Sequence, residues 1–302
     1  MRFIQFTAAL ASTLTLTSAA LIRRQAAAQS VAKLGGWIET LAVRPNGQLL
    51  ANRLDTPELW TIDPTTKQSS KLLSFPDALG ASGIAEISPD VYAVVTGNFS
   101  TKNFTLGSGS YTVHKVDLTG ATPKSTLIKK VPESGFFIGV APYNNDTIFI
   151  ADAGQGALYS LKISTGAYSI VLQDPKLKAP SDAFINEGIH GIKYVGGYLY
   201  FTNTFGNTFN KVKIDESGKP TGPITVINTS LQGPEDFVIT SDGTAYIATY
   251  TSSAVFKVTT NGTATPFANA TNPSSVAFGR TEKDKKILYI SNSEGSVFSA
   301  AV

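Results

Sequence analysis

Tyr246-Ile247-Ala248-Thr249 and Tyr289-Ile290-Ser291-Asn292 are the last two of six similar runs along this sequence. In each run apolar residues lead into a small or polar one. Successive runs begin 43 to 56 residues apart. The four earlier runs are Leu49-Leu50-Ala51-Asn52, Ala93-Val94-Val95-Thr96, Phe149-Ile150-Ala151-Asp152 and Tyr200-Phe201-Thr202-Asn203. A repeat of this length in a β-rich chain is typical of propeller blades.

The residues around each run describe one unit of the repeat. Turns such as Ser241-Asp242-Gly243 precede the runs, and their residue types accept the positive φ angles of tight hairpins. A third strand such as Val255–Val258 follows, and a weaker fourth strand completes the unit. A sandwich would not repeat this register, and solenoid repeats are usually shorter. We therefore predict an all-β, six-bladed propeller with four-stranded antiparallel blades around a central channel.

The N-terminus predicts a secreted protein. Arg2 precedes an apolar run rich in Thr and Ser, so residues 1–20 have the pattern of a signal peptide, with cleavage after Ala20 or as late as Ala28. Residues 29–302 then form a single propeller domain. Six Asn-x-Ser/Thr sequons agree with a secretory route and are predicted glycosylation sites. They are Asn98, Asn103, Asn145, Asn228, Asn261 and Asn269.

Composition narrows the range of partners. The chain has no cysteine, which excludes disulfides, thiolate metal sites and a cysteine nucleophile. Three of its 25 Lys and Arg residues lie in the first 28 positions, so the other 22 balance the 22 acidic residues. A balanced surface without a basic cluster predicts neither nucleic-acid nor membrane binding. Small-molecule substrates are the expected partners.

Function is expected in the channel, because the residue that opens each innermost strand points at its axis. Alignment of the units places six residues there: Glu39, Ser82, Ile138, His190, Asp236 and Ser275. We predict Glu39, His190 and Asp236 as catalytic residues, because two carboxylates and an imidazole can exchange protons or hold a cation. A register error would exchange Glu187 or Glu235 for these neighbours. The structural alternative is that such polar groups only hydrogen-bond one another and water.

The remaining substrate contacts are predicted around these positions. Two long segments, Asn98–Gly109 and Lys176–Asn186, should form loops over one face, where specificity tends to reside. Aromatic residues near the channel, Phe136, Phe137, Phe205 and Tyr250, suggest an apolar wall. The predicted substrate-binding residues are Phe137, Ile138, Ser82, Ser275, Asn203, Tyr250 and Arg53.

Three stretches of sequence carry a family resemblance. Trp37–Gly47 with Pro57-Glu58-Leu59-Trp60, then Gly188–Asn203, then Gly233–Gly243 resemble the fungal branch of the SMP-30/gluconolactonase-like propellers. Lactonases of that superfamily hold one divalent cation with an axial Glu, two Asn and an Asp. By this resemblance Glu39 matches the Glu and Asp236 the Asp, whereas Ile138 and His190 stand at the Asn positions. The resemblance thus implies that the metal set is eroded, and we expect no cofactor.

The same branch is similar to the hetero-Diels-Alderases of tropolone sesquiterpenoid biosynthesis. That resemblance implies dehydration of a hydroxymethyl tropolone to a quinone methide, which then reacts with a terpene alkene. Such chemistry needs an acid or base and an apolar cavity, but no metal. A metal-independent hetero-Diels-Alderase of secondary metabolism is therefore the leading hypothesis. A metal-dependent lactonase and a non-catalytic binding propeller are the alternatives.

Overall fold

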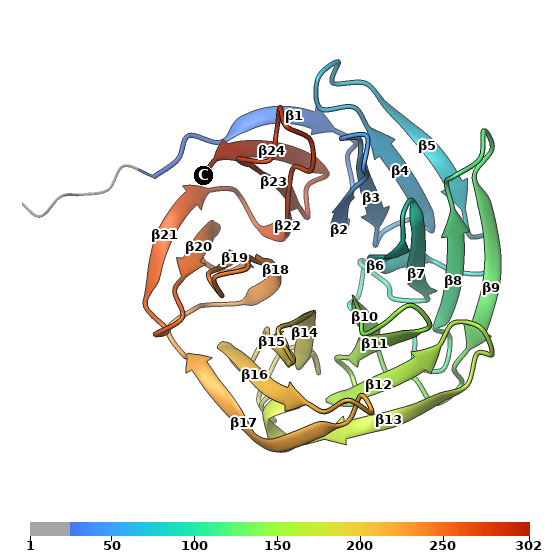
Figure 1. The fold of residues 1–302 in the computed structure, drawn as a ribbon, viewed down its shortest axis with the longest axis vertical. Helices are drawn as coiled ribbons and strands as arrows, with labels where there is room; N and C mark the ends of the chain where they lie inside the picture. Colours follow the sequence, from blue (N-terminus) through green and yellow to red (C-terminus); the bar gives the residue numbers. More distant parts are fainter. Residues whose placement is uncertain (1–24) are drawn as a thin grey trace, which may run out of the picture.

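The computed structural model describes residues 25–302, which form six four-stranded antiparallel sheets arranged as a ring (Figure 1). The predicted six-bladed propeller is confirmed. Blade 1 contains β2 (Ile38–Val43), β3 (Leu49–Arg53), β4 (Glu58–Ile62) and β5 (Ser69–Ser74). Blade 2 contains β6 (Gly80–Ser88), β7 (Val91–Gly97), β8 (Thr112–Asp117) and β9 (Lys124–Lys130). Blade 3 contains β10 (Phe137–Pro142), β11 (Thr147–Asp152), β12 (Ala157–Lys162) and β13 (Tyr168–Gln173). Blade 4 contains β14 (Ile189–Val195), β15 (Tyr198–Asn203), β16 (Thr208–Ile214) and β17 (Pro220–Asn228). Blade 5 contains β18 (Pro234–Ile239), β19 (Ala245–Thr249), β20 (Ala254–Val258) and β21 (Ala264–Asn269). Blade 6 contains β22 (Pro273–Phe278), β23 (Ile287–Asn292), β24 (Ser296–Ala301) and β1 (Gln29–Lys33).

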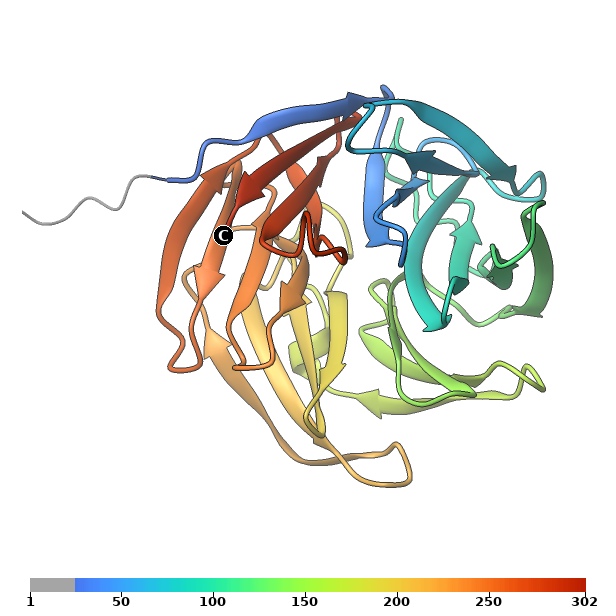
Figure 2. The same cartoon turned by 45° about the horizontal axis from the view of Figure 1, so that its top comes forward.

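Both ends of the chain build blade 6. Its three inner strands come from the C-terminus, whereas the outer strand β1 comes from the N-terminus and pairs antiparallel with β24. Figure 2 shows β1 lying along the outside of β24. The preceding Ala26 bridges to Ala268 of blade 5 and donates its N–H to the Phe267 carbonyl at 2.7 Å. The ring is therefore closed by main-chain hydrogen bonds between the two ends of the described chain.

The predicted signal peptide, residues 1–20, lies outside the described residues. The later cleavage option, near Ala28, would remove residues 25–28, which the structure describes. One of them, Ala26, forms the bridge to Ala268 of blade 5. The sole helix of the described chain is the short 3-10 turn Pro175–Leu177. No helix in residues 25–302 is long and apolar enough to cross a membrane.

The six repeated runs lie in the second strand of each blade, where neighbouring blades cover both faces of the sheet. Leu49–Asn52 and Phe149–Asp152, for example, are buried throughout. Burial on both faces explains why these strands show continuous apolar runs rather than an alternation of apolar and polar residues. At the hairpin between β14 and β15, Gly196 and Gly197 have φ angles of 58° and 80°, as a two-residue turn of this hand requires.

Candidate active site

A β-bulge near the start of every innermost strand sets which side chain faces the channel. In each blade the ladder between the first two strands shifts by one residue directly after its first pairs. Bulges commonly aim a side chain away from its regular direction, and they recur beside active sites. The six residues at this position are Glu39, Ser82, Ile138, His190, Glu235 and Ser274.

The sequence alignment agrees with these positions in blades 1 to 4 and is one residue too late in blades 5 and 6. Glu235 takes the place predicted for Asp236, and Ser274 the place predicted for Ser275. In both blades the residue before the bulge is a proline, Pro234 or Pro273, that pairs with the second strand. Proline is accepted as the first residue of a strand because no earlier ladder bond needs its missing N–H. Pro234 and Pro273 therefore open their strands, and the bulge residues that follow them are Glu235 and Ser274.

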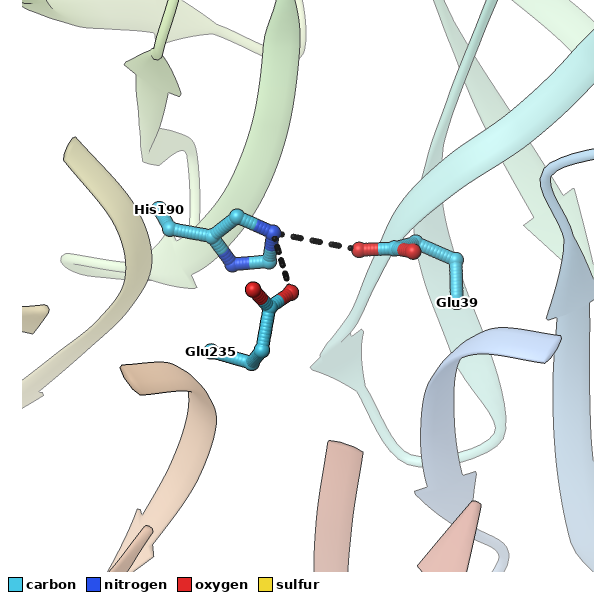
Figure 3. Close-up of side chains that lie close together, drawn as sticks. All are labelled: Glu39, His190 and Glu235. Carbon is cyan, nitrogen blue, oxygen red and sulfur yellow. Dashed lines mark ion pairs between the residues drawn. The ribbon is translucent and has the colours of Figure 1, made fainter. Parts of the chain in front are cut away.

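Three carboxylates converge on one ring nitrogen of His190. The His190 Nε2 atom lies 3.0 Å from Glu235 Oε2 and 3.3 Å from both Glu39 Oε1 and Glu187 Oε1. Figure 3 shows His190, Glu39 and Glu235 approaching one another from three different blades. Glu187 comes from the loop that precedes β14. We call Glu39, Glu187, His190 and Glu235 the His190 cluster.

The members of the His190 cluster lie at two depths. The side chains of Glu39 and His190 are 0% and 2% exposed, whereas those of Glu187 and Glu235 are 12% and 7% exposed. Trp37 Nε1 donates a 2.7 Å hydrogen bond to Glu39 Oε2 and holds that carboxylate in place. Glu39 Oε1 and His190 Nδ1 have no hydrogen-bond partner among the described residues. Buried polar groups normally have partners, so these two atoms leave hydrogen-bonding capacity for a bound molecule.

Burial and neighbouring charges together raise the pKa values of three members of this cluster, His190, Glu39 and Glu235. Burial would lower the pKa of His190, but the charge of Glu235, followed by contacts with Glu187 and Glu39, raises that pKa well above its ordinary value. Burial raises the pKa of Glu39 although His190 opposes the shift. Burial likewise raises the pKa of Glu235 to about 7. The cluster therefore combines an imidazolium with a carboxyl group that is partly protonated near neutral pH.

Asp236 belongs to a different group of side chains. Its Oδ1 atom lies 2.5 Å from Lys193 Nζ, and its Oδ2 atom accepts a 2.7 Å hydrogen bond from Ser275 Oγ. Ser275 Oγ in turn accepts the N–H of Leu41 at 3.1 Å. We call Lys193, Asp236 and Ser275 the Lys193 cluster. Each of its charges is paired, as expected of a structural network between blades 1, 4, 5 and 6.

A cavity of about 390 Å³ opens above the His190 cluster. Four of the five phenylalanines that line it form a continuous phenylalanine wall, with ring-centre separations of 4.8 to 6.4 Å between neighbours. These four are Phe99, Phe104, Phe136 and Phe184. Trp37 and Tyr250 form a second aromatic surface, stacked at 6.0 Å with an interplanar angle of 12°. No Lys or Arg is among the described residues that line the cavity. The volume and mixed lining are those of a small-molecule site.

The predicted substrate-binding residues divide into two sets. Ile138 and Tyr250 line the cavity, as do Phe136 and Phe205 of the suggested apolar wall. Five others make contacts within or between blades instead. They are Phe137, 4.9 Å from Tyr159; Ser82, which donates to the Phe137 carbonyl; Ser275, bonded to Asp236; Arg53, paired with Asp55; and Asn203, which donates to the carbonyls of Lys176 and Lys178.

Both predicted loops border the cavity, and they carry three aromatic lining residues that the sequence analysis did not single out. Phe99 and Phe104 lie in the segment 98–109, and Phe184 lies in the segment 176–186. Phe184 is 81% exposed although it is a large apolar residue. The aromatic content of these two loops was the available signal. Glu187 directly follows the second loop, and its contact with His190 is visible only in three dimensions.

The metal set implied by the lactonase resemblance does not fit these residues. Ile138 offers no ligand atom, and Asp236 is engaged by Lys193 and Ser275. Calcium prefers six to eight oxygen ligands, which this group does not supply. Glu39, His190 and Glu235 do offer one oxygen or nitrogen atom each within 4.8 Å of one another. That smaller set would suit a cation that accepts imidazole.

Comparison with known proteins gives relatives in sequence and in fold. No model of a known protein family matches the chain. The chain is 28% identical over 308 residues to "Putative hetero-Diels-Alderase asR5" of Sarocladium schorii, covering 85% of this chain and 75% of that protein. It is 29% identical over 293 residues to a "Putative hetero-Diels-Alderase" of a Phoma species, covering 85% and 83%. A solved structure described as a putative gluconolactonase shares the fold at a TM-score of 0.69, with 14% identity and coverage of 91% and 92%.

The resemblance predicted from the sequence is confirmed. It holds in sequence for the hetero-Diels-Alderases over most of the chain, and in fold for the gluconolactonase-type propeller.

Proposed function

We propose that this protein is a metal-independent hetero-Diels-Alderase of fungal secondary metabolism. It would couple a quinone methide, formed from a hydroxymethyl tropolone-type precursor, to a terpene alkene. Both sequence relatives bear the name "Putative hetero-Diels-Alderase", and the chain is accordingly an enzyme with small-molecule substrates. The observation that carries the proposal is the position of an acid–base cluster at the base of an aromatic cavity.

Dehydration of the precursor is the first step that the cluster would assist. The ring hydroxyl loses a proton, the C–O bond of the hydroxymethyl group breaks, and the departing hydroxide takes a proton and leaves as water. Glu235 faces the cavity, and burial raises its pKa to about 7, so it can deliver that proton. The His190 imidazolium, 3.0 Å from Glu235, stabilises the carboxylate that remains.

Cycloaddition of the quinone methide is the second step. Its oxygen and three carbons form the four-atom component, the alkene supplies two carbons, and one C–O and one C–C bond form without proton transfer. Orientation of both reactants in one cavity is therefore the main contribution that a protein can make. The phenylalanine wall supports this role, because it offers apolar surface for a hydrocarbon beside the polar cluster.

The direct test measures adduct formation by purified protein. A hydroxymethyl tropolone and a macrocyclic terpene alkene are incubated with and without protein, and the adduct is followed by chiral chromatography. We expect a faster reaction and one dominant stereoisomer. An unchanged rate and an unchanged stereoisomer ratio would falsify the proposal.

A metal-dependent lactonase or related hydrolase is the second candidate. The three ligand atoms of Glu39, His190 and Glu235 within 4.8 Å of one another support it. It predicts stoichiometric divalent metal in purified protein and lactone turnover that a chelator abolishes. The hetero-Diels-Alderase proposal predicts instead that EDTA changes adduct formation by less than about twofold, since that reaction uses general acid–base catalysis without a Lewis acid.

Secretion and glycosylation are part of the proposal. Five sequons, at Asn98, Asn103, Asn145, Asn261 and Asn269, have exposed asparagines. Asn228 is only partly exposed, and its amide donates a 2.9 Å hydrogen bond to the Gly262 carbonyl. We therefore expect glycans at up to five positions and none at Asn228. Mass spectrometry of protein from the medium of a fungal host, before and after deglycosylation, tests both points.

A further inference from the structure

Dehydration to a quinone methide requires a base as well as an acid, and the base must reach the substrate. Glu39 and His190 are the buried pair of the His190 cluster, with side chains 0% and 2% exposed. All four members line the cavity, but Glu187 and Glu235 have the more exposed side chains, at 12% and 7%. With Glu235 as the acid, Glu187 is the other carboxylate of the cluster that has exposed side-chain surface on the cavity, since the Glu39 side chain is fully buried.

The surroundings of Glu187 suit a base. Its Oε1 atom lies 3.3 Å from His190 Nε2, and an adjacent imidazolium stabilises the charge of a carboxylate. Among the described residues, the cavity lining includes no Lys or Arg that would form a permanent ion pair with this carboxylate. A hydroxyl group brought by the substrate is therefore the natural hydrogen-bond donor for this carboxylate.

Glu187 follows a loop, but the chain around it is held firmly. The Asn203 side chain donates to the carbonyls of Lys176 and Lys178 at 2.9 and 2.8 Å. The N–H of Gly188 donates to the Ala153 carbonyl at 3.0 Å. A Cβ atom at Gly188 would lie 2.0 Å from the Leu177 carbonyl oxygen, so only glycine allows this close approach. The Asn186 side chain also donates a 2.7 Å hydrogen bond to the Gly154 carbonyl, so both neighbours of Glu187 in the chain are bonded to blade 3, and the start of the loop is bonded to blade 4.

We propose that Glu187 is the catalytic base of the dehydration, an assignment that rests on the proposed function. Its carboxylate takes the proton of the ring hydroxyl while Glu235 protonates the departing hydroxide, and water leaves. Glu187 is then neutral and Glu235 charged. Because both contact His190 Nε2, the imidazolium passes its proton to Glu235 and takes the proton of Glu187 on the same nitrogen. The cluster returns to its starting state without exchange with bulk solvent.

The test separates dehydration from cycloaddition with the variant Glu187→Gln. One assay starts from the hydroxymethyl tropolone, and the other starts from a silyl-protected precursor that releases the quinone methide when fluoride is added. We expect Glu187→Gln to slow the first assay by about 10²- to 10⁴-fold, the usual contribution of a general base. The second assay should keep the wild-type stereoisomer ratio, with a rate within about threefold.

Asp182→Asn is the matched control, because Asp182 is an exposed acid of the same loop. It should match wild type in both assays. Wild-type dehydration by Glu187→Gln would overturn the assignment, as would an equal loss in both assays, which indicates a disturbed cavity. If Glu187→Gln does not fold, Glu187→Asp serves instead, with the same pattern and a smaller loss. Failure of wild type in both assays would instead contradict the proposed function.

Discussion

The His190 and Lys193 clusters both join the innermost strands of several blades, but their charges are arranged differently. In the Lys193 cluster one cation meets one carboxylate, and Ser275 satisfies the second carboxylate oxygen. In the His190 cluster one imidazole meets three carboxylates, and two buried polar atoms lack partners within the described chain. A network in which every charge is paired stabilises a fold. A network with unpaired charges and unpartnered polar atoms has shifted pKa values and can hydrogen-bond a ligand.

Glu235 and Asp236 make the comparison sharpest, because they are neighbours in β18 and belong to different clusters. Glu235→Gln should lower adduct formation from the hydroxymethyl precursor by about 10²- to 10⁴-fold, because the acid is lost. Asp236→Asn should keep the rate within about threefold and lower the free energy of unfolding by about 1–3 kcal/mol, because a charged hydrogen-bond network is broken. Steady-state rates and thermal melts of the two variants measure both quantities.

The reverse pattern, with Asp236→Asn inactive and Glu235→Gln only destabilised, would break the distinction between the clusters. Glu282→Gln is a suitable control for both variants, because Glu282 is 87% exposed and contacts Lys285 on the surface.

The rate of adduct formation from the hydroxymethyl precursor should fall about tenfold per pH unit on the alkaline side of its pH profile. Since Glu235 must be protonated to act as the acid and its pKa is raised to about 7, the rate should fall as pH rises above about 7. The free energy of unfolding should also fall as pH rises. The folded state holds the Glu235 proton more tightly than a carboxyl of ordinary pKa 4.5 does, so the contribution of Glu235 to stability declines between about pH 4.5 and 7. Rate profiles and melts of wild type and Glu235→Gln provide the measurement. An alkaline limb that persists in the residual rate of Glu235→Gln would assign it to another group.

Phe184 offers the smallest of these effects and tests the apolar side of the cavity. It is 81% exposed, so Phe184→Ala should leave the melting temperature unchanged. Loss of its contact with a hydrocarbon should raise the KM for the terpene alkene by about fivefold, because roughly 1 kcal/mol of apolar contact is removed. The KM for the hydroxymethyl partner should not change. Equal changes in both KM values would indicate that the phenylalanine wall does not distinguish the two reactants.

The fold of this protein could be predicted from its sequence because the repeat is local. A hairpin turn, a doubly buried strand and a third strand recur in every blade, and each depends mainly on nearby residues. The closure of blade 6 could not be predicted, since β1 and β24 are at opposite ends of the chain. Nothing near β1 in the sequence indicates its partner.

For the candidate site, the repeat predicted the channel positions of Glu39, Ile138 and His190, which the structure places on the cavity. Their catalytic or binding roles stay predictions. Glu235 lies at the axial position predicted for Asp236, because β18 begins at Pro234 and its bulge follows directly. Adjacent residues of a strand face different surroundings, so this shift of one residue changes the neighbours of the side chain. Glu187 belongs to the site only because a loop between blades 3 and 4 returns it to His190. Local pattern therefore determines the blades and most of the axial positions, whereas the convergence of three carboxylates on one imidazole depends on closing the ring.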